Sequence, residues 1–285
     1  MSRLLYIKRD IIYLFLKTLK LIKIKIKEVR EMKQIKHKLT TLFTFVFIVV
    51  IWYYTSLKVN NLFVPNPIEV FDNLKNMIVN GQLQIDIWYT FKRIFIASVI
   101  SGIISLPLGL LIYNFKFFKY SIDPIINLMR YVPITAFYPL LIMWLGIDEE
   151  MKIAFLFIAS FVYMLPSTVL ALEEINHDLI ETGYTIGMSK LQTITRIQLP
   201  AMLPSILNSF VMCFGIGFSY SAIVETINAK YGLGFLIQQS SSRGRTDLVF
   251  VGILVIMVIS FAFDNIAKFI IKKIFKWRFI NDSIE

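Results

Sequence analysis

The chain has 285 residues, of which 56% are hydrophobic and 17% are charged, and its mean hydropathy is +0.67. A soluble domain carries about 25% charged residues and a disordered chain far less apolar surface, so both classes are excluded. The net charge of +11 does not indicate nucleic acid binding, because 12 of the 30 Lys and Arg residues precede residue 39 and form one basic flank. The composition therefore predicts an all-α integral membrane protein.

Residues 1–38 form a basic segment in which lysines are interleaved with Leu, Ile, Tyr and Phe. The segment is too charged to cross a bilayer and is typical of a cytoplasmic helix that lies on anionic membrane lipid. No small-residue cleavage site follows a short apolar core, so we expect no cleaved signal peptide. A second interpretation stays open, in which translation starts at Met32 and only an ordinary basic flank precedes the first span.

Six apolar stretches follow, each near the roughly 20 residues that a helix needs to cross the hydrocarbon core. They are residues 39–57, 88–113, 124–146, 152–172, 203–227 and 248–271. With both termini inside, the cytoplasmic segments hold 22 Lys and Arg residues and the outer segments hold six. The positive-inside rule thus predicts a six-helix bundle with N-in and C-in topology. We expect one transmembrane domain over 39–275 and a cytoplasmic tail over 276–285.

The sequence predicts further helical or packed structure in two of the outer segments. Residues 58–86 contain two prolines and predict a short surface helix from about Pro67 to Asn80. Residues 228–247 begin with a Gly-rich turn and continue with a short apolar stretch. We expect this stretch to pack back against the bundle before the last span.

Small residues and prolines, rather than charges, distinguish the spans. The second span carries a stripe of small residues at helical spacing, Ser98, Gly102, Ser105 and Gly109. Such a stripe lets a neighbouring helix backbone approach closely. The third span contains enough prolines to break its regular hydrogen bonding, Pro124, Pro133 and Pro139.

The sequence lacks the motifs that indicate catalysis or metal binding. The middles of the spans are almost bare of ionisable groups, with Glu225 near one outer end and Asp264 near one inner end. The sequence contains no metalloprotease, serine hydrolase or phosphate-loop motif. We therefore expect no catalytic residue, no metal and no cofactor, and any ATP has to be hydrolysed by another chain.

The cytoplasmic segment between the fourth and fifth spans gives the strongest signal. Asp178 and Glu181 have the spacing of a capping box that starts a helix, and Gly187 is expected to end that helix. Ser189 and Gln192 have the spacing of a second capping box. The pattern predicts a compact helical knob of the kind that docks into a groove on a partner protein.

This segment resembles the EAA loop of ABC importer permeases, whose pattern is Glu-Ala-Ala, three residues, Gly, nine residues and Ile-x-Leu-Pro. The matching residues, within a loop of about 176–202, are Glu181, Gly187, Ile197, Leu199 and Pro200. Thr182 and Gly183 replace the two alanines, which alters how closely the first helix packs. The resemblance implies a coupling loop in which Glu181 contacts an ATPase subunit and Gly187 forms the turn. A capping acid that touches no partner is the alternative for Glu181.

Other segments resemble permeases of the nitrate/sulfonate/taurine type, and together they cover about residues 60–275. They are residues 64–70, 130–133, 138–140, 144–147, 232–234 and 247–254. The resemblance implies a multi-pass plasma membrane permease of the type I importer kind. Its implied partners are a cytoplasmic ABC ATPase, an extracellular solute-binding protein and a second copy of the chain.

The same resemblance suggests where a solute passes and which solute it is. Candidate residues for the translocation path are Tyr131, Pro133, Tyr138 and Glu225. For Glu225, an interfacial acid that simply reaches water is the alternative. Sulfonates, taurine and nitrate are the implied solutes, and small organic compounds such as thiamine precursors are served by related permeases.

Two other classes of membrane protein are alternatives to the importer permease. A secondary transporter driven by an ion gradient needs coupling-ion ligands or acids within the membrane, which the bare spans do not offer. A polytopic membrane enzyme needs a catalytic pair, and the sequence suggests none.

Overall fold

The computed structural model describes residues 32, 36, 39–129 and 131–279, and within them all regular structure is helical. The chain divides into two compact units, residues 1–67 and 68–285, which we describe separately. The predictions for the basic segment before residue 39, apart from positions 32 and 36, lie outside the described residues. The last six positions of the predicted tail also lie outside them.

The first unit contains the helix Leu39–Lys58, which is long and apolar enough to cross a membrane. This helix confirms the predicted first span. The loop that follows it is tied back to it, because the Trp52 Nε1–H donates a hydrogen bond of 3.0 Å to the Pro65 carbonyl.

The second unit begins within a short helix and contains four long helices. The elements are α2 (Pro67–Val79), α3 (Gln82–Asn114), α4 (Lys116–Met129), η1 (Ile134–Phe137), α5 (Tyr138–Leu145), α6 (Glu149–Glu173), α7 (His177–Thr185), α8 (Lys190–Thr193), the π-helical turn η2 (Ile194–Gln198), α9 (Leu199–Val224), α10 (Leu233–Ser242), α11 (Thr246–Ile274) and η3 (Lys276–Phe279). α3, α6, α11 and the continuous run from α8 to α9 are each long and apolar enough to span a membrane, which confirms four predicted spans. α2 confirms the short helix that the sequence predicts from Pro67.

The predicted third span is not one helix over 124–146. The stretch consists of α4 and η1–α5, which are bent by 94° at the break and are long and apolar enough for a span only when taken together. The break has a simple cause, since Pro133 has no N–H for a helical hydrogen bond and stands with extended ψ of 113° just before η1. Pro139 does not interrupt α5, because it lies in the first turn, where a backbone N–H needs no partner.

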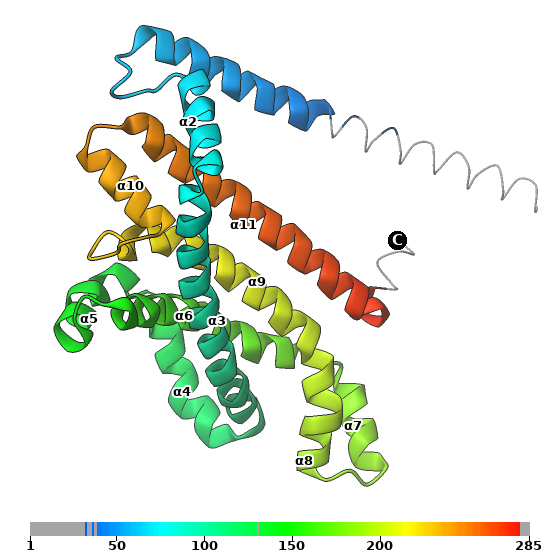
Figure 1. The fold of residues 1–285 in the computed structure, drawn as a ribbon. Helices are drawn as coiled ribbons and strands as arrows, with labels where there is room; N and C mark the ends of the chain where they lie inside the picture. The colour runs from blue at the N-terminus through cyan, green and yellow to red at the C-terminus, as the bar shows by residue number, and fades with distance from the viewer. Residues whose placement is uncertain (1–31, 33–35, 37–38, 130, 280–285) are drawn as a thin grey trace, which may run out of the picture. The chain divides into compact units, whose positions relative to one another are not determined.

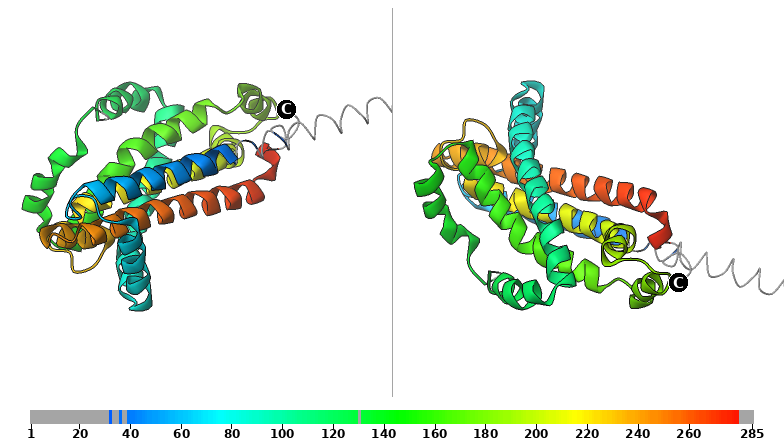
Figure 2. Two further views of the ribbon diagram at one scale, coloured as in Figure 1. Left: turned by 90° about the horizontal axis from the view of Figure 1, so that it is seen from above. Right: turned by 90° about the horizontal axis from the view of Figure 1, so that it is seen from below.

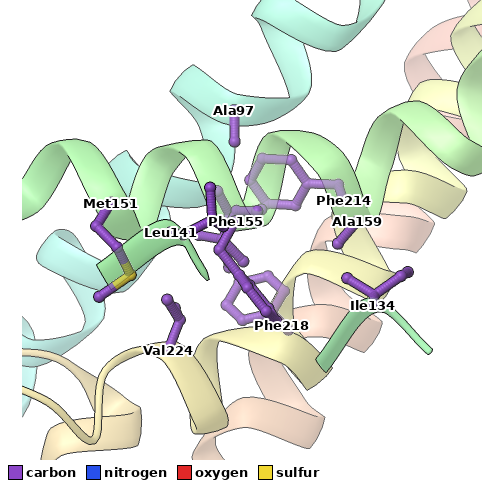
Figure 3. Packing of buried hydrophobic residues seen from close by; sticks show 11 residues of the cluster. Ala97, Ile134, Leu141, Met151, Phe155, Ala159, Phe214, Phe218 and Val224 are labelled. Atoms are coloured by element: carbon purple, nitrogen blue, oxygen red, sulfur yellow. The ribbon is translucent and has the colours of Figure 1, made fainter. Parts of the chain in front are cut away.

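The core of the second unit forms where α3 crosses α6 and α9. Figures 1 and 2 show α9 and α11 side by side, with α3 crossing them. In Figure 3, Ala97 of α3 points at Phe155 and Phe214, and Phe218 fills the space beneath them. Because lipid is as apolar as these side chains, close packing rather than escape from water holds the helices together.

Small residues permit that close packing, as the sequence predicted. A Cβ atom on Gly109 of α3 would lie 2.5 Å from the Thr168 side chain of α6. A Cβ atom on Gly217 of α9 would lie 2.5 Å from the Ile94 side chain of α3. Both distances are shorter than carbon atoms tolerate, so only glycine fits at these helix crossings.

Candidate functional site

Residues 176–198 form the predicted knob, which lies at the end of α9 opposite to α10 (Figure 1). Its first helix, α7, ends in a Schellman motif at Gly187, whose φ of +82° is left-handed. The Gly187 N–H donates to the Tyr184 carbonyl and the Met188 N–H to the Gly183 carbonyl, each at 3.0 Å. The prediction that Gly187 ends this helix is confirmed.

The capping residue of α7 differs from the prediction. Asn176, not Asp178, is the N-cap, because the Asn176 side chain accepts a hydrogen bond of 2.9 Å from the Asp178 N–H. Asp178 already lies inside the first helical turn, where its charge suits the helix dipole but cannot cap. The second prediction is confirmed, since Ser189 and Gln192 form a reciprocal capping box.

The two parts of the knob pack through a glycine. Gly183 is buried, and a Cβ atom there would lie 2.7 Å from Ile197 Cδ1. The exchange of the second motif alanine for glycine therefore lets α7 lie closer to the turn η2. Ile197 and Leu199 are half-buried in this packing, whereas Pro200 is exposed.

Exposed residues of the knob include acidic and large apolar side chains. Glu181 and Gly187 are exposed, and neither contributes to the core. Four large apolar side chains of the knob are exposed as well, Leu179, Tyr184, Ile186 and Leu191. We call these six exposed residues of the knob the knob face, and their composition is suited to protein docking.

A second polar site lies at the opposite end of the bundle, where α3 and α6 begin and α9 ends. Arg93 of α3 makes a bidentate ion pair with Glu149 of α6, at 2.6 and 2.7 Å, and a further ion pair of 2.8 Å with Glu225. The side chains of Arg93 and Glu225 are 3% and 0% exposed. The Arg93 guanidinium thus joins the outer ends of three helices.

The same site fixes the loop between α9 and α10. The N–H groups of Gly232, Leu233 and Gly234 donate to Asp86, Thr90 and Glu225, at 2.8 to 2.9 Å. A Cβ atom on Gly234 would lie 2.5 Å from the Ser221 carbonyl oxygen, so the loop requires glycine to reach its acceptors. The prediction that this segment packs back against the bundle is confirmed. We call Asp86, Thr90, Arg93, Glu149 and Glu225 the outer polar cluster.

A cavity of about 650 Å³ opens beside the outer polar cluster. Lys152 is buried in its wall, where its Nζ donates to the Ile147 carbonyl at 3.2 Å and lies 3.6 Å from Glu149. The rings of Tyr89 and Tyr231 also line the cavity and stack with their centroids 5.1 Å apart. Acidic and basic groups are mixed around the cavity, so its lining does not select one sign of charge.

The four residues predicted for the translocation path do not form one group. Glu225 is enclosed in the outer polar cluster, so the alternative that it reaches water is wrong. Tyr138 lies 3.4 Å from Thr226, the residue after Glu225, through their hydroxyl oxygens. Tyr131 is 85% exposed, and Pro133 is exposed as well, at the break in the third span.

Sequence reasoning did not identify the outer polar cluster as a unit. It gave no role to Arg93, Glu149, Asp86 or Thr90. One signal was present, since Asp86, Thr90 and Arg93 are spaced by four and three residues and so share one helix face.

Comparison with known proteins places residues 101–276 within one family model, the binding-protein-dependent transport system inner membrane component. The chain is 29% identical to the taurine transport system permease protein TauC of Escherichia coli (strain K12), over 81% of this chain and 86% of TauC. It is 26% identical to the putative aliphatic sulfonates transport permease protein SsuC of Bacillus subtilis (strain 168), over 75% of this chain and 78% of SsuC. Its fold is similar to a chain of the MetNI methionine ABC transporter in inward-facing conformations, with a TM-score of 0.53, 23% identity, and coverage of 64% of this chain and 93% of that one.

Proposed function

The chain belongs to the binding-protein-dependent transport system inner membrane components, as a multi-pass permease subunit of an ABC importer, and we propose that its knob is the coupling element that receives movement from a separate ATPase. Family membership decides against the secondary transporter that the sequence left open. The observation that carries the proposal is the knob face, in which large apolar side chains are exposed on the same short element as Glu181 and the turn at Gly187.

The geometry of the knob supports docking rather than a role in the fold alone. Its backbone is held by a Schellman motif and a reciprocal capping box, so the exposed side chains stand on a rigid frame. A preorganised surface loses little entropy when a partner binds it. Because the chain has no phosphate-loop motif, ATP hydrolysis belongs to the docked partner in this proposal.

A second copy of the chain completes the translocation path in our proposal. The break between α4 and η1 leaves non-helical backbone in the third span, with Tyr131 and Pro133 exposed beside it. Such backbone at membrane depth has to be covered by protein or lie against water, because lipid offers no hydrogen bonds. A pair of chains that face each other across this break would enclose a wet path lined by Tyr131, Pro133 and Tyr138.

An external solute-binding protein selects the solute in this proposal, since few fixed charges line the spans. The likeness to permeases for taurine and aliphatic sulfonates supports a small sulfonate as cargo. Thermal-shift screening of the cognate binding protein against taurine, alkane sulfonates, nitrate and thiamine precursors tests the cargo. A melting temperature raised by one of the last two alone would overturn the sulfonate assignment.

The coupling role is tested by Gly187→Val and Glu181→Lys in membranes that also contain the ATPase. Gly187→Val strains a left-handed position, and Glu181→Lys reverses the charge of the knob face. We expect normal membrane levels, loss of ATPase co-purification and loss of uptake.

Matched controls for these two variants lie on the outer side of the protein. Gly81→Val imposes the same strain, since Gly81 has a φ of +74° with open space around it, and Asp72→Lys reverses an exposed acid on α2. Both controls should retain the ATPase. Co-purification of the ATPase with both knob variants at wild-type levels would refute the coupling role.

A further inference from the structure

A pair of side-chain amides joins the knob to the corner between α3 and α4. Asn114 Nδ2 donates to Gln198 Oε1 at 2.8 Å, and Gln198 Nε2 donates back to Asn114 Oδ1 at 3.1 Å. Asn114 Nδ2 also donates to the Leu110 carbonyl at 3.0 Å, which fixes the rotamer of the side chain. Each neutral carboxamide carries both donors and an acceptor, so two of them can exchange hydrogen bonds in this reciprocal way.

Gln198 is buried and Asn114 is half-buried, and the two residues stand at points where regular helix geometry changes. Gln198 is 2% exposed and is the last residue of the π-helical turn η2, immediately before α9. Asn114 is the last residue of α3, and the next residue, Phe115, is extended before α4 begins. π-Helical turns and element ends are the places where helices absorb changes in backbone angle.

Lys190 reinforces the same connection. Its Nζ donates a hydrogen bond of 2.7 Å to the Asn114 carbonyl and lies 4.0 Å from the centroid of the Phe115 ring. Both ends of the second half of the knob, α8 and η2, are therefore fastened to the same corner. By contrast, the ion pair of 3.4 Å between Lys119 and Glu173 at this end of the bundle has two half-exposed side chains, and such surface pairs contribute little.

We propose that the Asn114–Gln198 pair is a positioning contact that transmits movement of the knob to the α3–α4 corner, and through α4 to the broken third span. The proposal rests on the proposed function, in which the knob receives the movement of the ATPase. When the knob shifts, Gln198 moves with it, because η2 follows α8 without a break. The two hydrogen bonds then displace Asn114 together with the start of α4. A contact that serves only stability would instead affect how much transporter accumulates and leave each assembled transporter fully active.

The test uses the assembled importer in lipid nanodiscs with Asn114→Leu, Gln198→Leu and the double variant. Leucine keeps a similar volume and removes the hydrogen bonds. Lys119→Met is the control, since it removes only the exposed ion pair at the same end. ATPase activity per complex is measured with and without the solute-loaded binding protein.

We expect the ATPase to co-purify with all variants and basal hydrolysis to stay at the control level. Stimulation by the loaded binding protein should fall by about fivefold or more, the low end of typical coupling between sites. The double variant should be no worse than either single one, because the two residues act as one contact. If the Leu variants fail to accumulate, Gln198→Glu replaces them with the same expectation, since it keeps the acceptor and removes the donor.

Two results would overturn the inference. One is stimulation per complex equal to that of Lys119→Met, and the other is loss of ATPase co-purification from the amide variants. Neither depends on the knob test above, because Gly187→Val and Glu181→Lys report on docking. The knob variants could lose docking while the amide variants keep wild-type stimulation. That combination would refute the transmission contact and leave the coupling role standing.

Discussion

Arg93 and Glu225 lie 132 positions apart in the chain and meet as a buried ion pair, with Arg93 Nη1 2.8 Å from Glu225 Oε1. The pair joins the outer end of α3 to the end of α9, and Glu149 adds the start of α6. Burying two charges is costly, and their attraction repays the cost only when further hydrogen bonds satisfy them. Thr90, the Gly234 N–H and the Tyr231 carbonyl supply those bonds here.

Removing one member of this ion pair should lower the free energy of unfolding more than removing both members. Arg93→Leu leaves the Glu225 carboxylate buried without its cation and should cost about 3–5 kcal/mol in the free energy of unfolding. Arg93→Leu/Glu225→Leu removes the buried carboxylate as well and leaves only Glu149, which is half-exposed and lies 3.6 Å from Lys152, so it should be less destabilised than Arg93→Leu. Thermal unfolding in detergent measures the order. A double variant that melts below Arg93→Leu would contradict this account of the outer polar cluster.

Gly234→Ala should loosen the loop between α9 and α10. The added Cβ would lie 2.5 Å from the Ser221 carbonyl oxygen, a backbone atom that cannot swing away, so we expect a loss of about 1–3 kcal/mol in the free energy of unfolding. Gly215→Ala is the matched control, because its Cβ would meet nothing within 4 Å. Equal melting temperatures for the two variants would show that the loop between α9 and α10 accommodates the added methyl group.

Within the knob, Gly183→Ala should push α7 away from η2, since the new Cβ would lie 2.7 Å from Ile197 Cδ1. Ile197→Val deletes that methyl group and should restore the packing when the two changes are combined. Hydrogen exchange of the α7 amides measures the effect, with faster exchange in Gly183→Ala and near wild-type exchange in the pair. Unchanged exchange in Gly183→Ala would mean that the helix does not depend on this contact.

The topology predicts which side of the membrane each exposed site faces. In a Cys213→Ser background, a membrane-impermeant maleimide should label Ser241→Cys in intact cells. The same reagent should label Leu191→Cys only after the membrane is permeabilised. Cys213 itself is buried, so its replacement should not disturb the labelling. Labelling of position 191 in intact cells would reverse the assigned orientation.

The features that could be predicted from the sequence are those that depend on short stretches of the chain. Apolar length identified the spans, Pro67 marked the start of α2, and Gly187 and the Ser189–Gln192 spacing outlined the knob. These features depend on neighbours within a few residues, where propensity and capping act. The cap of α7 was misplaced by two residues, because Asn176 and Asp178 both suit a helix start and only the backbone angles separate them.

The outer polar cluster and the Asn114–Gln198 pair could not be predicted in the same way. Their side-chain pairs join residues 56 to 135 positions apart, and the partner of Asp86 is 146 positions away, so the pairing follows from how the helices cross rather than from any local pattern. The bend of the third span was foreseen from its prolines. The extension of that span back to Lys116 was not, because Lys116 and Lys119 made this stretch too charged to read as part of a span.

Site-specific crosslinking from the knob face tests the coupling role most directly. Leu191 is 70% exposed on that face, so Leu191→Cys in the Cys213→Ser background can carry a maleimide-linked photocrosslinker without disturbing the core. In the assembled importer, the coupling role predicts a crosslink from position 191 to the ATPase and none from Asp72→Cys on the outer helix α2. A complex that contains the ATPase but gives no crosslink from position 191 would contradict the assignment of the knob as the coupling element.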